Sequence, residues 1–224
     1  DYRQIYYFDR RKIIGKRKRN SQSLKEFNII IIGGGLSGSS TALNLSKKGY
    51  SVLVIEKEVV QNFKPCAGGM ASSMKRFLPV NIEPVIESRV KKVEFTWKSS
   101  DKVIADLSGE SPFWIIKREN LDNLLLNESL KLGVEILRPA TVEKIKKEND
   151  KWVVNCSNKF QYKSEFLVIA DGSQSIWAEY FKLGPRKPKF ANTIALRLSG
   201  LGNIPKDSVR FEFGFLKYGF AWAF

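Results

Sequence analysis

The residues best placed to do chemistry are three glycines in the pattern G-x-G-x-x-G, Gly33, Gly35 and Gly38, followed by Glu56. In such a pattern the first glycine permits a tight turn, the second lets a pyrophosphate approach the backbone, and the third lets a helix pack against a strand. The N-terminus of that helix offers free N–H groups to phosphate. An acid about 20 residues further on accepts hydrogen bonds from a ribose hydroxyl and disfavours a 2′-phosphate. The spacing therefore predicts a dinucleotide site.

The segments around these residues are those that such a site needs. Residues 28–32 are nearly all β-branched and apolar, which predicts a strand buried on both faces. Residues 39–48 carry leucine and alanine at helical spacing, Gly49 is a helix stop, and residues 50–55 form a second apolar run. This order is that of a complete βαβ unit. The alternative is a glycine-rich turn in an ordinary α/β domain.

Composition limits the other functions open to the chain. Its 224 residues, 43% apolar, suffice for one domain or one and a part, and no run has the length of a transmembrane helix. The complete absence of histidine excludes histidine-ligated zinc, Ser-His-Asp triads and a histidine general base. We predict no metal site. Two cysteines, Cys66 and Cys156, are too few for a disulfide framework, so a reducing compartment is expected.

The formal charge of +15 is partly concentrated at the start of the chain. Residues 1–25 hold nine Lys or Arg against two Asp. We interpret residues 1–26 as a disordered basic segment, and contact with anionic lipid or nucleic acid is the alternative. Because no nucleic-acid reader motif occurs, we expect no nucleic-acid partner for the folded body. The chain begins with Asp rather than Met, which suggests a fragment.

A second small-residue turn, KPCAGG, occupies residues 64–69 and precedes an expected helix at 71–77. Gly68 and Gly69 would leave room for a flat ligand ring, and Cys66 would lie close to it. Cys66 has a second interpretation as a small buried hydrophobe. Residues 90–97 and 102–107 alternate apolar with polar side chains, which predicts an antiparallel hairpin and hence a second sheet.

The remainder of the chain returns to the nucleotide sheet. Arg118 precedes a predicted helix at 119–132 and could hold a phosphate or a ring oxygen, or simply lie at the surface. A short strand at 134–137 and a meander over 141–147, 151–156 and 160–162 follow. Residues 165–170 predict a strand buried on both faces. Asp171 and Gly172 come directly after it, where open α/β sheets bind ligands, although Asp-Gly also favours a simple turn.

The order of these motifs resembles the flavin-dependent oxidoreductases built on the glutathione-reductase type of FAD fold. Within them the KPCAGG turn resembles the geranylgeranyl reductase family. The last residues, YGFAWAF at 218–224, are similar to that family's G-Y-x-W-x-F-P segment. The resemblance covers residues 27–224. It has departures: Ile169 stands at a usual glycine, Trp177 at a frequent arginine, and the chain ends before the family's second Gly-Asp flavin motif.

The resemblance implies an α/β architecture: an FAD-binding Rossmann-like three-layer domain with a parallel sheet and a β-meander, plus part of an antiparallel-sheet substrate domain. We expect the FAD-binding domain at 27–190, with a hairpin inserted at about 90–107, and the truncated start of the substrate domain at 191–224. Cys66 would be catalytic, while Tyr218 and Trp222 would line the substrate pocket. The implied FAD contacts are Gly33, Gly35, Leu36, Ser37, Gly38, Glu56, Lys57, Gly68, Gly69, Arg118, Asp171 and Gly172.

The resemblance also implies reduction of carbon–carbon double bonds in a geranylgeranyl chain, with hydride from reduced FAD and NAD(P)H or ferredoxin as external donor. The substrate would be an isoprenoid small molecule or lipid. A cytoplasmic location is expected, with peripheral membrane contact through the basic segment. Two alternatives stay open: an FAD-dependent aromatic monooxygenase or halogenase, and an inactive nucleotide-binding fragment.

Overall fold

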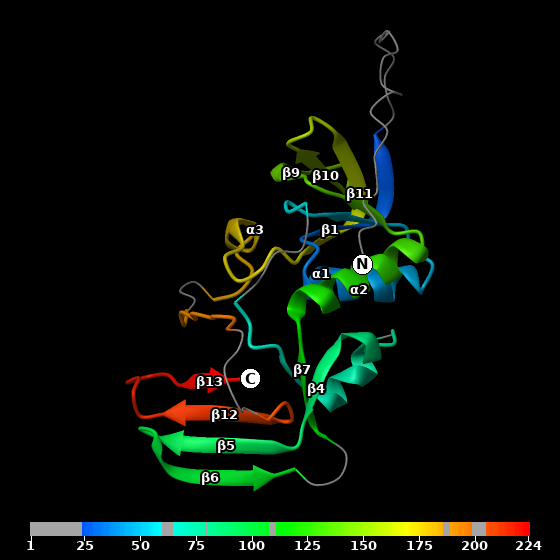
Figure 1. Cartoon of the computed structure of the whole chain (residues 1–224). Coiled ribbons are helices and arrows are strands. Elements are labelled where there is room, and N and C mark those ends of the chain that lie inside the picture. The colour runs from blue at the N-terminus through cyan, green and yellow to red at the C-terminus, as the bar shows by residue number, and fades with distance from the viewer. Residues whose placement is uncertain (1–23, 60–64, 79, 108–110, 186–188, 199–204) are drawn as a thin grey trace.

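The computed structural model describes residues 24–59, 65–78, 80–107, 111–185, 189–198 and 205–224. These residues form a six-stranded sheet flanked by helices, a separate four-stranded sheet, and a small three-stranded sheet between them (Figure 1). Residues 1–23 of the predicted basic segment lie outside the described residues. The six-stranded sheet has, in spatial order, β8 (Glu135–Leu137), β2 (Val52–Ile55), β1 (Lys25–Ile32), β11 (Gln161–Ile169), β10 (Lys151–Cys156) and β9 (Val142–Glu148).

The predicted βαβ unit is present at the centre of this sheet. Strand β1 pairs in parallel with β2 and with β11, and helix α1 (Leu36–Ser46) connects β1 to β2. The strand begins earlier than expected, because Lys25 and Glu26 already pair with residues 162 and 163 of β11. These two residues therefore belong to the sheet and not to the basic segment.

Strand β1 is buried on both faces, as its run of isoleucines predicted. Ile30 and Ile32 belong to a buried cluster that includes Val154 of the meander strand β10. Ile29 and Ile31 belong to another, which includes Ala42 of α1. All four isoleucines are at most 5% exposed. Side chains of successive strand residues point to opposite faces, so an unbroken apolar run fits a strand covered on both sides. Helix α2 (Arg118–Lys131) lies beside α1 on the same face (Figure 1).

The meander is present, with one correction. The predicted strands at 160–162 and 165–170 are one continuous strand, β11, because residues 161–164 pair with β10 and residues 162–169 pair with β1. No glycine or proline interrupts residues 160–169, so nothing ends the strand between the two segments. The strand is also not buried on both faces: Phe166 is 62% exposed in the described structure.

The expected hairpin is β5 (Lys92–Trp97) and β6 (Ser100–Asp106), joined at Lys98 and Ser99, which both have positive φ. It forms a four-stranded sheet with β12 (Ser208–Phe213) and β13 (Ala221–Ala223) in the order β13-β12-β5-β6. Two of its three pairings are antiparallel, as expected, whereas β12 pairs with β5 in parallel. A long connection, unlike a hairpin, does not fix strand direction.

The three-stranded sheet links the two larger ones. It consists of β3 (Gly69–Ala71), β7 (Phe113–Ile116) and β4 (Ile86–Val90). The expected helix at 71–77 is a 3₁₀-helix, η2 (Ser72–Phe77), without a side-chain cap and without a buried residue. Such a short, uncapped segment lacks the interactions that sustain an α-helix. Two further short helices are η3 (Glu83–Val85) and α3 (Ile176–Tyr180), the latter capped by the Ser175 hydroxyl.

Candidate functional site

The glycine turn after β1 has the geometry that a phosphate-binding turn requires. Gly33 has φ +100°, and a Cβ atom there would lie 2.4 Å from the carbonyl oxygen of Ala170. A Cβ atom on Gly38 would lie 1.8 Å from the carbonyl oxygen of Gly33. Both positions therefore require glycine, for a strand-to-turn contact and a helix-to-turn contact respectively.

The start of helix α1 is open to an anion. Gly35 is its N-cap and contributes no side-chain cap, and the first turn carries no acidic residue. Leu36 and Ser37 are the first two helical residues. The positive end of the helix dipole is thus left for a ligand, which fits the diphosphate of a dinucleotide.

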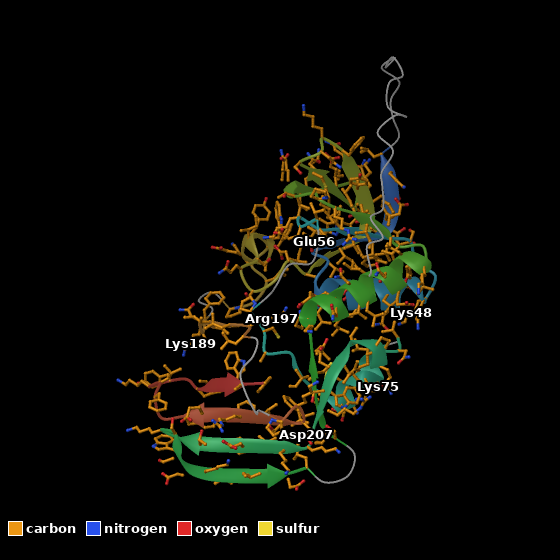
Figure 2. All side chains as sticks on the ribbon, viewed as in Figure 1. Lys48, Glu56, Lys75, Lys189, Arg197 and Asp207 are labelled. Carbon is orange, nitrogen blue, oxygen red and sulfur yellow. The ribbon has the colours of Figure 1, made fainter. Side chains whose placement is uncertain are left out.

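Glu56 lies directly beside this turn, at the end of β2 (Figure 2). It is only 8% exposed. Its Oε2 atom accepts a 2.6 Å hydrogen bond from the Gly34 N–H, and Oε1 accepts one of 2.9 Å from the Glu58 N–H. The carboxylate therefore holds the glycine turn in shape, a role that the sequence did not predict. Each oxygen keeps a second lone pair for a ribose hydroxyl, so the predicted contact stays a prediction. Lys57 beside it is exposed.

The Asp171 turn adjoins the glycine turn from the neighbouring strand. The Ala170 N–H donates to Ile32 O at 2.8 Å, and a Cβ atom on Gly33 would lie 2.9 Å from the Asp171 Cα atom. The Oδ1 atom of Asp171 is buried and has no hydrogen-bond partner among the described residues. Gly172 has φ +98° with open space at its Cβ position. A buried acceptor beside the phosphate turn fits a ligand that brings hydroxyl groups.

Arg118 joins the turn at residues 65–69, which we call the Cys66 turn, to the start of α2. Its Nη1 atom is 3.8 Å from Cys66 Sγ, and its Nη2 atom is 3.4 Å from Asp122 Oδ1. The Nε atom is buried and has no partner among the described residues. Asp122 is fully buried. Of the predicted residues, the structure thus brings Cys66 and Arg118 together, and Asp122 is a member of the cluster that sequence reasoning missed.

The explanation predicted for Gly68 and Gly69 does not hold. A Cβ atom on Gly68, which has φ +80°, would lie 1.9 Å from Ile116 O. A Cβ atom on Gly69 would lie 2.4 Å from the Phe113 ring and 3.2 Å from the Phe224 ring. The missing side chains allow β7 and the C-terminal aromatic residue to approach, rather than leaving space for a ligand ring. Contact of these glycines with a cofactor stays a prediction.

One face of the four-stranded sheet is aromatic. Phe211 lies opposite Phe95 on one neighbouring strand and opposite Trp222 on the other. Ring centroids within this set lie 5.5–6.5 Å apart. We call this surface the aromatic face; its residues are Phe95, Phe211, Phe213, Phe220, Trp222 and Phe224.

Trp222 lies among these aromatic rings, and its contact with a substrate stays a prediction. Tyr218 does not share this position: its side chain is 93% exposed, and the Lys217 ammonium group lies 5.4 Å from its ring centroid. The alternating Val-x-Phe-x-Phe of residues 209–213 was the sequence signal for the aromatic face, and it was overlooked.

A cavity of about 610 Å³ lies between α1, β3, η2 and the start of α2. The three polar residues of α1 that line it donate hydrogen bonds to backbone carbonyl groups of the preceding turn. Ser40 donates to Leu36 O, Thr41 to Ser37 O, and Asn44 to Ser40 O. The lining that remains is apolar. It comprises Leu36, Leu45, Met70, Ala71, Met74, Phe77, Leu78 and Leu121, with Gly69 at one end. The sequence did not reveal this cavity, because its walls come from segments far apart in the chain.

Comparison with known proteins identifies the class of fold. Residues 28–81, which contain the glycine turn and Glu56, match the family model described as FAD dependent oxidoreductase. The chain is 28% identical, over 90% of its length and 52% of the relative, to an uncharacterized protein of Methanosarcina barkeri. It is 29% identical, over 76% of its length and 41% of the relative, to YgcN of Escherichia coli, named a probable electron transfer flavoprotein-quinone oxidoreductase. The chain spans about half the length of these curated relatives.

Solved structures agree on the fold. A geranylgeranyl bacteriochlorophyll reductase-like protein of Thermoplasma acidophilum superposes with a TM-score of 0.71 at 18% identity, covering 89% of this chain and 53% of its own. The p-nitrophenol 4-monooxygenase of Pseudomonas putida superposes with a TM-score of 0.60 at 20% identity. The match covers 69% of this chain and 43% of the monooxygenase. Halogenase PltM, solved with FAD, superposes with a TM-score of 0.57 at 23% identity. The match covers 70% of this chain and 36% of the halogenase. The chain has the α/β fold of FAD-binding Rossmann-like oxidoreductases.

Residues 28–81 are thus similar to FAD-dependent oxidoreductases, and one of the structural neighbours was solved with FAD. The residues present fit FAD. The glycine turn and the uncapped start of α1 follow β1, and the buried Asp171 oxygen follows the neighbouring strand β11. Within the described residues, no helix is long and apolar enough to cross a membrane.

Proposed function

We propose that this chain is the FAD-binding part of a reductase that saturates carbon–carbon double bonds in an isoprenoid chain. The observation that carries the proposal is the contact between the aromatic face and the Cys66 turn. Gly69 lies three residues after Cys66, against the rings of Phe113 and Phe224, and those two rings are 5.9 Å apart. An extended apolar wall beside the candidate cofactor site suits a long hydrocarbon substrate.

The roles of the residues follow from their positions. The start of α1 and the glycine turn would hold the diphosphate of FAD, and Glu56 and Asp171 would accept hydrogen bonds from its hydroxyl groups. Bound FAD would supply the hydride. The aromatic face would align the isoprenoid chain and exclude water, while Cys66 or a water molecule near Arg118 would supply the proton. NAD(P)H or ferredoxin is the proposed electron donor.

The substrate class is supported further by the charge of the chain. A formal charge of +15 favours a diphosphate head group or an anionic membrane surface beside an apolar pocket. Among the solved structures named above, the reductase-like protein covers 89% of this chain, against 69% and 70% for the monooxygenase and the halogenase. Likeness at such identity shows the fold, so the substrate class rests on the aromatic face and the charge.

The test is a single-turnover reaction. The full chain is loaded with FAD, reduced without oxygen, and mixed with geranylgeranyl diphosphate. We expect the absorbance of oxidised flavin to return and the product to gain two hydrogens per bond, as measured by mass spectrometry. Phe220→Ala should weaken substrate binding, whereas Phe160→Ala, an exposed aromatic on the meander, should not. Reoxidation only when oxygen and a phenol are added would assign a monooxygenase or halogenase instead.

A second candidate is electron transfer to a quinone. It is favoured by the 29% identity to YgcN and by the same aromatic face, which would also accept a flat quinone ring. The reduced flavin would then be reoxidised by a short-chain quinone analogue, with no hydrogen added to the geranylgeranyl chain.

A further inference from the structure

Asp122 is a buried carboxylate near the start of α2, paired with Arg118. Asp122 lies on the inner face of α2 with a fully buried side chain, between Leu121 and the leucines of the next turn. Burying an ionised carboxylate is costly unless cations or hydrogen-bond donors compensate it, and an apolar residue of similar size would often stabilise the helix more. The partners of this carboxylate therefore matter for its role.

The contacts of Arg118 indicate that role. Residues four apart on a helix lie on the same face, and Asp122 Oδ1 is 3.4 Å from Arg118 Nη2. The other terminal nitrogen of the same guanidinium, Nη1, is 3.8 Å from Cys66 Sγ. An arginine side chain has many rotamers when free, but its planar fork is fixed once one side is held.

The Cys66 turn is held in place by hydrogen bonds within itself and to β7. The Gly68 N–H points to Cys66 Sγ at 3.4 Å, and the Ile116 N–H donates to Gly68 O at 2.9 Å. The turn is thus held by β7 at one end and faces Arg118 at the other. Arg118 Nε, buried and without a partner among the described residues, is the donor left for an acceptor atom of a bound molecule.

We infer that Asp122 is a positioning residue that holds the Arg118 guanidinium against the Cys66 turn, so that Nε presents its proton to the bound cofactor or substrate. The inference rests on the proposed function only for the identity of that ligand. The arrangement itself belongs to the protein and can be tested without flavin.

The first measurement is hydrogen exchange on the flavin-free full chain. We expect Asp122→Asn to speed exchange at the amides of Gly68 and Ile116 by roughly two- to tenfold, with Leu43 and Leu125 in the core unchanged. Glu128→Gln is the matched control, because it removes a carboxylate paired with Lys131 at the surface of the same helix. Unchanged exchange at Gly68 and Ile116, or an equal increase throughout the core, would overturn the inference.

A double-mutant cycle shows whether Asp122 acts through Arg118. In the Arg118→Gln background, Asp122→Asn should add no further increase in exchange at the Cys66 turn, whereas additive effects would contradict the inference. If either single variant fails to fold, the double variant is compared directly with the wild type, because removing both partners of a buried pair is tolerated better than removing one. It should show faster exchange confined to the Cys66 turn.

The second measurement is FAD affinity across the same cycle. We expect about a tenfold increase in Kd for Asp122→Asn, for Arg118→Gln and for the double variant alike. If the wild-type chain binds no FAD, the proposed function fails, while the exchange measurement still decides the role of Asp122. If FAD binds equally to all variants, the ligand contact assigned to Arg118 is wrong.

Discussion

The Gly38 Cα atom is packed so closely against the Gly33 carbonyl group that a Cβ atom at position 38 would lie 1.8 Å from the oxygen. This contact sets the distance between the start of α1 and the end of β1. It also determines how far the helix N-terminus projects toward a phosphate, so that stability and cofactor binding depend on the same atoms.

We therefore expect Gly38→Ala to lower the free energy of unfolding by about 1–3 kcal/mol, because the backbone of the turn has to move. The same variant should lose FAD during gel filtration. Urea unfolding and the ratio of flavin to protein absorbance measure the two effects. Asn44→Ala, on the exposed side of the same helix, is the control and should change neither. Full retention of FAD by Gly38→Ala would show that the turn does not hold the diphosphate.

Glu56→Gln should destabilise the glycine turn. Both carboxylate oxygens of Glu56 accept backbone hydrogen bonds, and an amide would place an N–H group opposite either the Gly34 or the Glu58 N–H. We expect a loss of about 1–3 kcal/mol in urea unfolding. Glu135→Gln, which removes an exposed ion pair with Lys25, should cost less than about 1 kcal/mol. Equal effects of the two substitutions would contradict this assignment.

The ion pair between Glu119 and Arg197 predicts a loss of stability in acid. Arg197 donates to the two carboxylate oxygens at 2.5 and 2.9 Å, from the segment at 189–198 that approaches the start of α2 (Figure 2). These hydrogen bonds lower the pKa of Glu119 below its ordinary 4.5. A lowered folded-state pKa contributes stability above the unfolded pKa, and that contribution is lost as the pH falls through the folded value.

Unfolding midpoints of wild type and Glu119→Gln should accordingly differ most near pH 7 and converge as the pH drops below about 4.5. The comparison is made by urea unfolding at several pH values. A difference that stays constant into acid would mean that the ion pair contributes nothing to the stability.

The two cysteines should differ sharply in reactivity. Cys156 is 1% exposed, and burial raises the pKa of its thiol to about 11, so it stays protonated at pH 8. Cys66 is partly exposed. We expect iodoacetamide at pH 8 to label Cys66 in the folded chain and to spare Cys156 until urea is added, as read by peptide mass spectrometry. Labelling of Cys156 at the same rate would contradict the burial of β10.

The βαβ unit was predictable because its signals are local. A run of isoleucines, a glycine pattern and one acid occur within 30 residues, and each reports directly on backbone geometry. The hairpin at β5 and β6 was predictable for the same reason, since alternation and a turn suffice.

The rest of the site depends on contacts between distant segments. Asp122 contacts Arg118, which also reaches Cys66 from a distant part of the chain, and no local pattern encodes this arrangement. The glycines at 68 and 69 were recognised as special, but the reason is the approach of Ile116, Phe113 and Phe224. Likewise, β11 pairs with two neighbours at once, and although no glycine or proline interrupts residues 160–169, its continuity was not predicted because it depends on that pairing.

The parallel pairing of β5 with β12 has a consequence for how the chain is made. Thr96 donates to Glu212, 116 positions later, so the hairpin leaves the ribosome long before its partner strand exists. At about 5–20 residues per second, that interval is roughly 5–25 seconds. During it, Phe95 and the unpaired edge of β5 face solvent or other chains. We expect the nascent protein to need shielding by a chaperone at this stage, and refolding from denaturant to be slow and sensitive to protein concentration.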